Sequence, residues 1–185
     1  MTRRVFPATL ALAAIGGAIL SAQAPGGAPA ARLEVPYVQF TLSNGLHVIL
    51  HQDKTVPVAA VNVWYHVGSG SEKPGRTGFA HLFEHLMFMG SQNAVYPAFD
   101  RLLEAAGANN NGSTTEDRTN YYESGPVSAL PLMLWLEADR MGWLLPTMDA
   151  AKVDAQRDIV KNERRQSYEN QPYGMVADHM PRMLY

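Results

Sequence analysis

The chain has 185 residues, of which 46% are hydrophobic and 17% are charged, a composition within the range of a single globular domain. Its formal net charge is −2, so charge gives no argument for a nucleic-acid partner or for an anionic membrane surface. It contains no cysteine, which excludes disulfide frameworks, cysteine nucleophiles and thiolate metal sites. Any metal must therefore be held by nitrogen and oxygen ligands.

The N-terminus has the pattern of an export signal. Two arginines precede an apolar run over residues 8–20, and small residues follow in an A-x-A pattern that ends at Ala24. The run is shorter than the roughly 20 residues needed to cross a bilayer, which favours a cleaved signal over a membrane anchor. We therefore expect a signal peptide at 1–24, with residues 28–30 as an alternative cleavage region. The protein is then exported to the periplasm or outside the cell, with no membrane span after signal removal.

Residues 25–36 are rich in proline, glycine and alanine and are typical of a flexible leader. The ordered domain is expected to begin near Tyr37 and to cover residues 37–185. Residues 175–185 have the pattern of a further helix, so we expect a domain that is incomplete at its C-terminus.

The first elements expected after the leader are strands. Val38–Leu42 and Leu46–His51 flank Asn44-Gly45, the strongest short signal for a hairpin turn. Val58–Val67 alternates in polarity and predicts a third strand. Residues 68–78 contain four glycines and a proline and predict a loop.

Helical periodicity begins at Phe79 and continues to Met89, followed by a glycine. The later elements are predicted as a helix at Ala98–Ala106 closed by Gly107, strands at Asn109–Glu116 and Thr119–Glu123, a helix with Pro126 in its first turn that runs to about Leu144, and a helix at Ala150–Glu169 capped by Asp149. Strands and helices come in separate runs. This order predicts an α+β domain with helices packed on one face of a mostly antiparallel sheet.

One motif in the first predicted helix carries chemistry. His81, Glu84 and His85 form the pattern His-x-x-Glu-His, which places all three side chains on one helix face. Two imidazoles one turn apart can bind one Zn²⁺ at about 2.0–2.1 Å, and the carboxylate beside them can accept a proton from an activated water. Histidines on an apolar helix are often core residues. Three ionisable groups on one face of such a helix, however, are costly to bury without a partner.

This segment resembles the M16 family (pitrilysin, insulinase and mitochondrial processing peptidase), whose signature is H-x-x-E-H. In that family the third zinc ligand is a glutamate on a later helix. The resemblance assigns this role to Glu163, with Glu169 as the competing candidate. It implies a site for one zinc ion per chain, held by His81, His85 and the later glutamate, although Mn²⁺ or Co²⁺ also suits nitrogen and oxygen ligands.

The resemblance extends to a pair of strands that, in the family, lies beside the zinc and pairs with extended substrate. It places Asn111, Gly112 and Ser113 along the substrate-binding edge, where free backbone groups can recruit a peptide as an added strand. One position departs from the family pattern. Many members carry a second glutamate seven residues before the ligand glutamate. Here Gln156 stands at that position, which keeps hydrogen-bonding capacity but removes a charge, so its influence on the zinc ligands is expected to differ.

These features predict a zinc-dependent endopeptidase that hydrolyses peptides or unfolded protein segments, with Glu84 as general base and then proton donor. Two alternatives remain open: a substrate-binding subunit without catalysis, and a catalytically silent fragment. Because M16 proteins resemble paired homologous domains, we expect a second M16-type domain, in cis or in trans, to be required. We also expect the 185-residue chain alone to show little activity.

Overall fold

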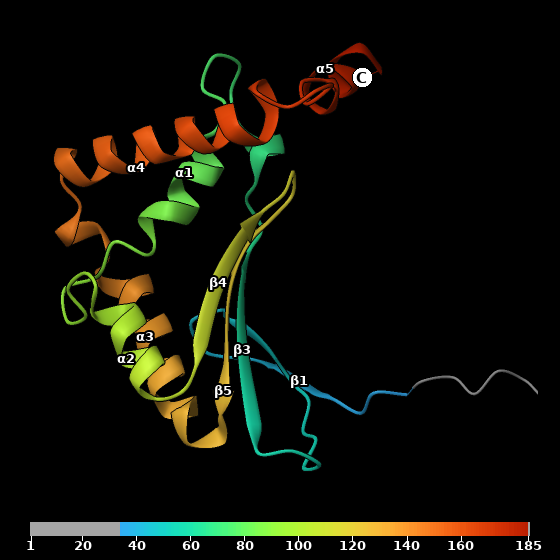
Figure 1. The fold of residues 1–185 in the computed structure, drawn as a ribbon. Coiled ribbons are helices and arrows are strands. Elements are labelled where there is room, and N and C mark those ends of the chain that lie inside the picture. Colours follow the sequence, from blue (N-terminus) through green and yellow to red (C-terminus); the bar gives the residue numbers. More distant parts are fainter. Residues whose placement is uncertain (1–33, 185) are drawn as a thin grey trace, which may run out of the picture. The chain divides into compact units, whose positions relative to one another are not determined.

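The computed structural model describes residues 34–184, which fall into two compact units that divide after residue 52 (Figure 1). The predicted signal peptide, and the predicted leader up to residue 33, lie outside the described residues. In the described part of the chain, no helix is long and apolar enough to cross a membrane.

The first unit contains one β-hairpin. Strands β1 (Val38–Thr41) and β2 (His47–Leu50) pair antiparallel, as the Asn-Gly turn predicts. Gly45 has φ of 88°, a left-handed conformation that glycine adopts without steric cost. The Asn44 side chain accepts a hydrogen bond from the backbone N–H of Leu46 at 3.1 Å and closes the turn.

The second unit is an antiparallel three-stranded sheet with helices on one face, which confirms the predicted α+β class (Figure 1). The sheet order is β3 (Val58–Tyr65), β5 (Thr119–Pro126) and β4 (Asn109–Thr114). Its helices are α1 (Phe79–Leu86), α2 (Ala98–Ala105), α3 (Leu130–Trp143), α4 (Ala150–Arg164) and α5 (Val176–Leu184), with short turns η1 (Ser69–Ser71), η2 (Val127–Ala129), η3 (Leu145–Thr147) and η4 (Arg165–Glu169) between them.

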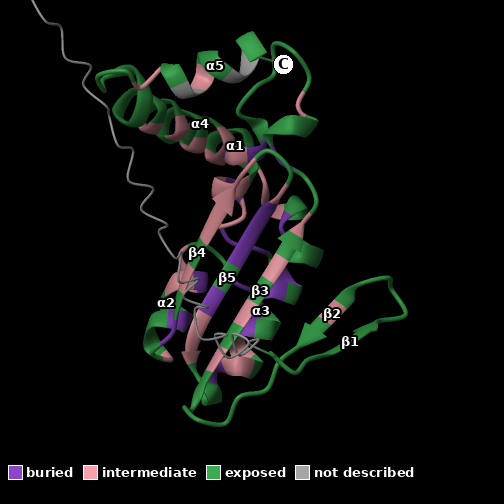
Figure 2. Ribbon diagram, turned by 90° about the vertical axis from the view of Figure 1, so that its right-hand side faces the viewer, coloured by how far each residue is buried: buried purple, intermediate pink, exposed green. Residues whose placement is uncertain are grey.

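The apolar core lies between this sheet and the helices α2 and α3. Its largest members are Phe99 and Leu103 from α2 and Met133 and Leu136 from α3, all at most 2% exposed. In Figure 2 the central strand β5 carries most of the buried positions of the sheet. One face of the sheet is therefore covered by helices.

The structure corrects the boundary between the last strand and the helix that follows it. Pro126 was expected in the first turn of a helix, but it ends β5, where it pairs with Val58, and α3 begins only at Leu130. The backbone N–H of Val127 donates to Pro57 at 3.0 Å, so the sheet continues past the predicted strand end. Proline is tolerated here because its nitrogen points away from β3 and the pairing of β4 with β5 stops at Ser124, so the missing N–H removes no ladder hydrogen bond.

Most of the other predicted elements end earlier than expected, and β3, for example, ends at Tyr65 instead of Val67. The first helix ends at Leu86 instead of Met89, and the strand expected at Asn109–Glu116 ends at Thr114. The regular part of α4 ends at Arg164, and η4 continues it as a wider, π-helical turn. The predicted N-cap of α4 is confirmed: Asp149 accepts a hydrogen bond from the backbone N–H of Lys152 at 2.8 Å.

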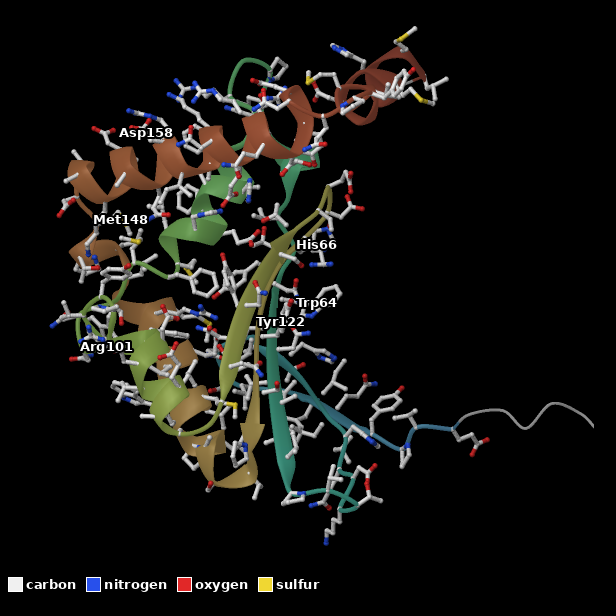
Figure 3. All side chains as sticks on the ribbon, in the orientation of Figure 1. Trp64, His66, Arg101, Tyr122, Met148 and Asp158 are labelled. Atoms are coloured by element: carbon white, nitrogen blue, oxygen red, sulfur yellow. The ribbon has the colours of Figure 1, made fainter. Side chains whose placement is uncertain are left out.

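The face of the sheet that lies away from the helices carries exposed aromatic and polar side chains (Figure 3). Trp64 is 63% exposed and Tyr122 is 38% exposed. The Arg118 guanidinium lies 4.9 Å from the centre of the Trp64 ring, and its Nη1 donates to the Ser113 hydroxyl at 2.7 Å. These contacts stiffen the outer face near the β4–β5 turn.

Candidate metal centre

Helix α1 carries the His-x-x-Glu-His motif and is fixed at its N-terminus by a carboxylate. Glu72 accepts hydrogen bonds from the backbone N–H groups of Gly78 at 2.8 Å and Ala80 at 2.7 Å. These donors have no partner within the helix, and a negative charge is favourable at this end. The loop before α1 therefore helps to set the position of the motif.

Three predicted ligand side chains converge between α1 and α4. The Nε2 atoms of His81 and His85 lie 3.3 Å apart, and Glu163 Oε2 lies 3.5 Å from His81 Nε2 and 3.3 Å from His85 Nε2. Together they form the group of potential metal ligands found in the described residues. His85 is the most covered of the three, with 19% of its side chain exposed.

These separations fit a small tetrahedral cation. Ligand atoms at about 2.0–2.1 Å from zinc, arranged tetrahedrally, lie about 3.3–3.4 Å from one another. The three observed distances of 3.3, 3.3 and 3.5 Å match this edge length. Two imidazole nitrogens and one carboxylate oxygen are also ligands that zinc prefers, and three protein ligands leave a fourth position for water.

Gln156 lies on the same face of α4 as Glu163, two turns earlier. Its Oε1 atom lies 3.3 Å from His85 Nδ1, and its Nε2 donates to the sulfur of Met89 at 2.9 Å. Because an amide oxygen can only accept, His85 Nδ1 is the protonated ring nitrogen. The lone pair of His85 Nε2 then faces His81 and Glu163.

Glu169, the competing ligand candidate, lies outside this cluster. Its Oε1 accepts a hydrogen bond from Arg164 Nε at 3.1 Å, and both side chains are nearly half exposed. The π-helical turn η4 separates it from the regular part of α4 that carries Glu163. Of the two candidates, the structure brings only Glu163 to the histidines.

Glu84 lies on the motif face of α1 but is held by the sheet. Its Oε2 accepts a hydrogen bond from the Thr114 hydroxyl of β4 at 2.5 Å. Thr114 is not predictable as a partner of Glu84 from the sequence, because nothing in the local pattern shows which residue of β4 faces α1. The sequence feature that could have pointed to Thr114 is its position directly after the predicted substrate-binding residues.

The predicted substrate-binding residues Asn111, Gly112 and Ser113 lie on β4, the edge strand of the described sheet next to α1. The backbone N–H of Thr115 donates to the carbonyl of Arg118 at 2.8 Å, so by antiparallel alternation the backbone groups of Ser113 and Asn111 turn toward β5. Those of Gly112 face the free edge.

The side chains of this edge are already partly engaged. The backbone N–H of Gly112 points away from β5 and donates a hydrogen bond to Asn111 Oδ1 at 2.8 Å, and the Ser113 hydroxyl donates to Asn120 at 2.7 Å. The substrate-binding role of the three residues stays a prediction. The position required for strand addition, an edge strand beside the motif helix, is present.

A buried charged cluster joins Glu123 of β5 to Glu137 and Arg140 of α3, and it was not predicted from the sequence. Arg140 Nε donates to Glu137 at 2.9 Å, and Arg140 Nη2 lies 3.3 Å from Glu123 Oε1; all three residues are at most 2% exposed. Three aromatic rings surround the guanidinium carbon, at 4.3 Å (Tyr121), 4.7 Å (Phe99) and 5.5 Å (Phe88). The signal in the sequence was a set of charged residues at positions whose periodicity predicts burial.

One guanidinium faces two carboxylates in this cluster, and this imbalance affects their ionisation. Burial raises the pKa of Glu123 to about 9, reinforced by the hydrogen bond and charge of Glu137 and opposed by Arg140. Burial likewise raises the pKa of Tyr121 above its ordinary value of 10. Burial beside Glu137 therefore favours the protonated form of Glu123 in the folded protein.

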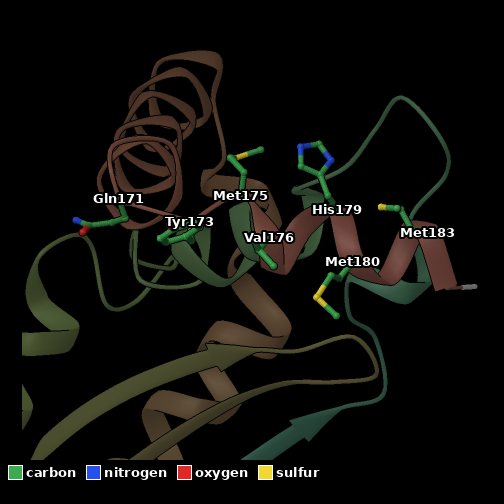
Figure 4. Close-up of a pocket in the computed structure, with 7 residues that line it drawn as sticks. All are labelled: Gln171, Tyr173, Met175, Val176, His179, Met180 and Met183. Atoms are coloured by element: carbon green, nitrogen blue, oxygen red, sulfur yellow. The ribbon is translucent and has the colours of Figure 1, made fainter.

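A separate hollow of about 320 Å³ lies beside α5 (Figure 4). Its lining is mostly apolar and includes Met175, Val176, Met180 and Met183. None of the residues of the metal cluster lines it. The hollow is therefore not part of the candidate metal centre.

Comparison with known proteins assigns the chain to a protein family. Residues 47–185 match the family model described as Insulinase (Peptidase family M16). The chain belongs to the M16 peptidase family. This confirms the resemblance drawn from His81-x-x-Glu84-His85 and from the strand pair beside it.

Relatives of this M16 chain include a zinc protease and a subunit of the cytochrome b-c1 complex. It is 35% identical to the zinc protease PqqE of Helicobacter pylori over 137 residues, covering 74% of this chain and 30% of that protein. It is 29% identical to the cytochrome b-c1 complex subunit 1 of Rattus norvegicus over 161 residues, covering 87% of this chain and 32% of that protein. Family membership therefore leaves catalysis undecided.

A solved structure has the same fold. The crystal structure of a protease from Helicobacter pylori superimposes with a TM-score of 0.72 at 35% identity, over 77% of this chain and 34% of that one. The chain thus spans about a third of the length of the relatives it matches. The activity of a whole M16 protein, and its partners, are matters for proposal.

Proposed function

We propose that this chain carries the metal-binding and proton-transfer residues of a zinc-dependent endopeptidase that hydrolyses peptides or unfolded protein segments. The observation that carries the proposal is the cluster of His81, His85 and Glu163, whose ligand atoms lie 3.3–3.5 Å apart on the same side of α1 as Glu84. His81, His85 and Glu163 would hold the ion. When bound, zinc would supply a Lewis acid that polarises water and the scissile carbonyl.

The chain's own residues supply the remaining chemistry in this proposal. Glu84 accepts a proton from the attacking water and later donates it to the leaving amine. The free edge of β4 binds the substrate backbone as an added strand, which orients the scissile bond near Glu84. The Gly112 backbone lies against the Glu84 side chain, because a Cβ atom added to Gly112 would lie 3.1 Å from Glu84 Cγ.

A second M16-type domain, in cis or in trans, is part of the proposal. The described residues offer a base, a metal cluster and one substrate edge, all on one side of the reacting bond. A closing surface is needed to exclude water and to stabilise the oxyanion. Cytochrome b-c1 complex subunit 1 is by its name one subunit of a larger complex, which supports an arrangement with a partner. The N-terminal signal pattern supports an exported location.

The test replaces Glu84 with glutamine in the protein expressed from its complete reading frame. Glu84→Gln keeps the size of the side chain but cannot accept the proton, so zinc content should stay near one ion per chain while chelator-sensitive cleavage of a fluorogenic peptide falls by at least about 100-fold. Near-normal cleavage by this variant would overturn the assigned role of Glu84.

The principal alternative is a substrate-binding subunit that does not catalyse. The similarity to cytochrome b-c1 complex subunit 1 supports this alternative. This alternative predicts peptide binding without turnover, even in the zinc-loaded wild-type protein. Assaying wild type with and without an added C-terminal M16 domain separates it from a catalytic subunit that only lacks its partner.

A further inference from the structure

The catalytic carboxylate proposed above is held from the sheet and not from its own helix. The Thr114 hydroxyl lies 2.5 Å from Glu84 Oε2, although 29 residues of chain lie between them. A hydrogen bond to an ionised carboxylate of this length belongs to the strong, charge-assisted class. The contact therefore joins β4 directly to the proposed base.

The direction of this hydrogen bond follows from counting protons. The only other hydroxyl in contact with Thr114 is that of Thr119, at 3.4 Å, among the described residues. Thr119 donates its own proton to the carbonyl of Val67 at 3.0 Å. The single hydroxyl proton of Thr114 is therefore available to Glu84, which at this distance is the better acceptor.

The other oxygen of Glu84 is confined by the backbone of the same strand. A Cβ atom added to Gly112 would lie 3.1 Å from Glu84 Cγ and 3.2 Å from Glu84 Oε1, closer than most Cβ contacts. The Phe88 ring closes the same space, at 3.3 Å from this Cβ position. The Glu84 carboxylate therefore lies between the Thr114 hydroxyl and the Gly112 backbone, and Oε1 is the oxygen that does not bond to Thr114.

We propose that Thr114 is a positioning residue for proton transfer, because its hydroxyl fixes which oxygen of Glu84 remains free to take the proton from water. The inference rests on the proposed function. The terminal torsion of a glutamate is broad, so without the hydroxyl the carboxylate samples several orientations. Thr114 touches no reacting atom in this scheme and acts only through Glu84.

The physical consequence is a change in turnover with little change in binding. Removing a group that orients the base should lower kcat, while KM, which depends on the β4 edge, should stay nearly constant. General acid–base catalysis contributes about 100- to 10,000-fold, so loss of orientation should remove about tenfold. Metal content should not change, because Thr114 touches none of the three ligand side chains.

The experiment compares three variants of the protein expressed from its complete reading frame. Thr114→Val removes the hydroxyl at nearly constant volume, Thr114→Ser keeps it, and Thr115→Val makes the same change one residue along. We expect Thr114→Val to lower kcat about tenfold at unchanged KM and zinc content, with Thr114→Ser and Thr115→Val staying within about twofold of wild type. A Thr114→Val kcat within twofold of wild type, or an equal loss in Thr115→Val, would overturn the inference.

A readout without activity accompanies this assay. In a crystal structure of Thr114→Val, the Glu84 carboxylate should occupy more than one orientation, whereas in Thr114→Ser it should keep its wild-type place. A single unchanged orientation in Thr114→Val would also count against Thr114. If wild type itself shows no chelator-sensitive cleavage, the proposed function fails, and the crystal structures still decide whether Thr114 orients Glu84.

Discussion

The carboxylate of Glu163 on α4 lies 3.3 Å from the imidazole of His85 on α1, with 77 residues of chain between them. Helix α1 carries both histidines, but one helix turn supplies only two of the three ligands. The third depends on how α4 packs across α1, and the contact between the two helices is among the most extensive in the second unit.

The first prediction concerns metal stoichiometry. Glu163→Gln removes the anionic ligand and should reduce bound zinc from about one ion per chain to a small fraction of that, measured by elemental analysis after dialysis. Glu169→Gln is the matched control, because Glu169 pairs with Arg164 outside the cluster, and it should retain zinc. Full occupancy in Glu163→Gln together with loss in Glu169→Gln would reverse the assignment.

The second prediction concerns Gln156, whose oxygen accepts the proton of His85 Nδ1. Gln156→Leu removes this acceptor and leaves the ring free to change tautomer and orientation, so zinc affinity should fall by about 10- to 100-fold. Gln156→Glu should keep or increase affinity, because a carboxylate is the stronger acceptor. Competition with a chromophoric chelator measures both.

The matched control for Gln156 is Gln166→Leu, an exposed position on the turn that follows α4. It should bind zinc as wild type does. Equal affinities in Gln156→Leu and Gln166→Leu would show that the contact with His85 does not tune the metal site.

The third prediction concerns the carboxylate at the start of α1. Glu72→Ala leaves the backbone N–H groups of Gly78 and Ala80 without their acceptor, so the free energy of unfolding should fall by about 1–2 kcal/mol. Glu72→Gln retains one oxygen and should lose less. Urea unfolding measures the change, with the exposed Glu104→Ala as control. The role of Glu72 as a cap is wrong if both alanine variants are equally stable.

The fourth prediction concerns the pH dependence of stability. Glu123 faces Glu137 and Arg140, and its pKa rises from an ordinary 4.5 to about 9 on folding. Between these values the folded chain binds one more proton than the unfolded chain. The contribution of Glu123 to stability is therefore fully present below pH 4.5 and is lost as pH rises toward 9.

The variant that tests this is Glu123→Gln, which keeps a neutral hydrogen-bonding side chain at every pH. Its free energy of unfolding, measured at pH 5, 7 and 8.5, should rise relative to wild type as pH increases. Glu104→Gln, an exposed control, should run parallel to wild type. A constant difference between Glu123→Gln and wild type across this range would show that Glu123 titrates normally.

Much of the fold was predictable because the signals are local. The period of the apolar residues in α1 places His81, Glu84 and His85 on one helix face, since 3.6 residues make a turn. The Asn-Gly turn of the first hairpin, the alternation of β3 and the cap at Asp149 depend only on neighbouring residues. These elements, and the motif itself, were fixed by the sequence pattern alone.

The contacts that complete the site depend on tertiary structure, because they join residues far apart in the chain. Periodicity does not decide between Glu163 and Glu169; the choice follows from the packing of α4 on α1 and from the π-helical turn after Arg164. The register of β4 against β5 decides that Thr114 faces Glu84 while Ser113 turns to the other face. Sequence determined the chemistry that this chain carries, and sheet register and helix packing decided which side chains meet, because both are set by the burial of a common core.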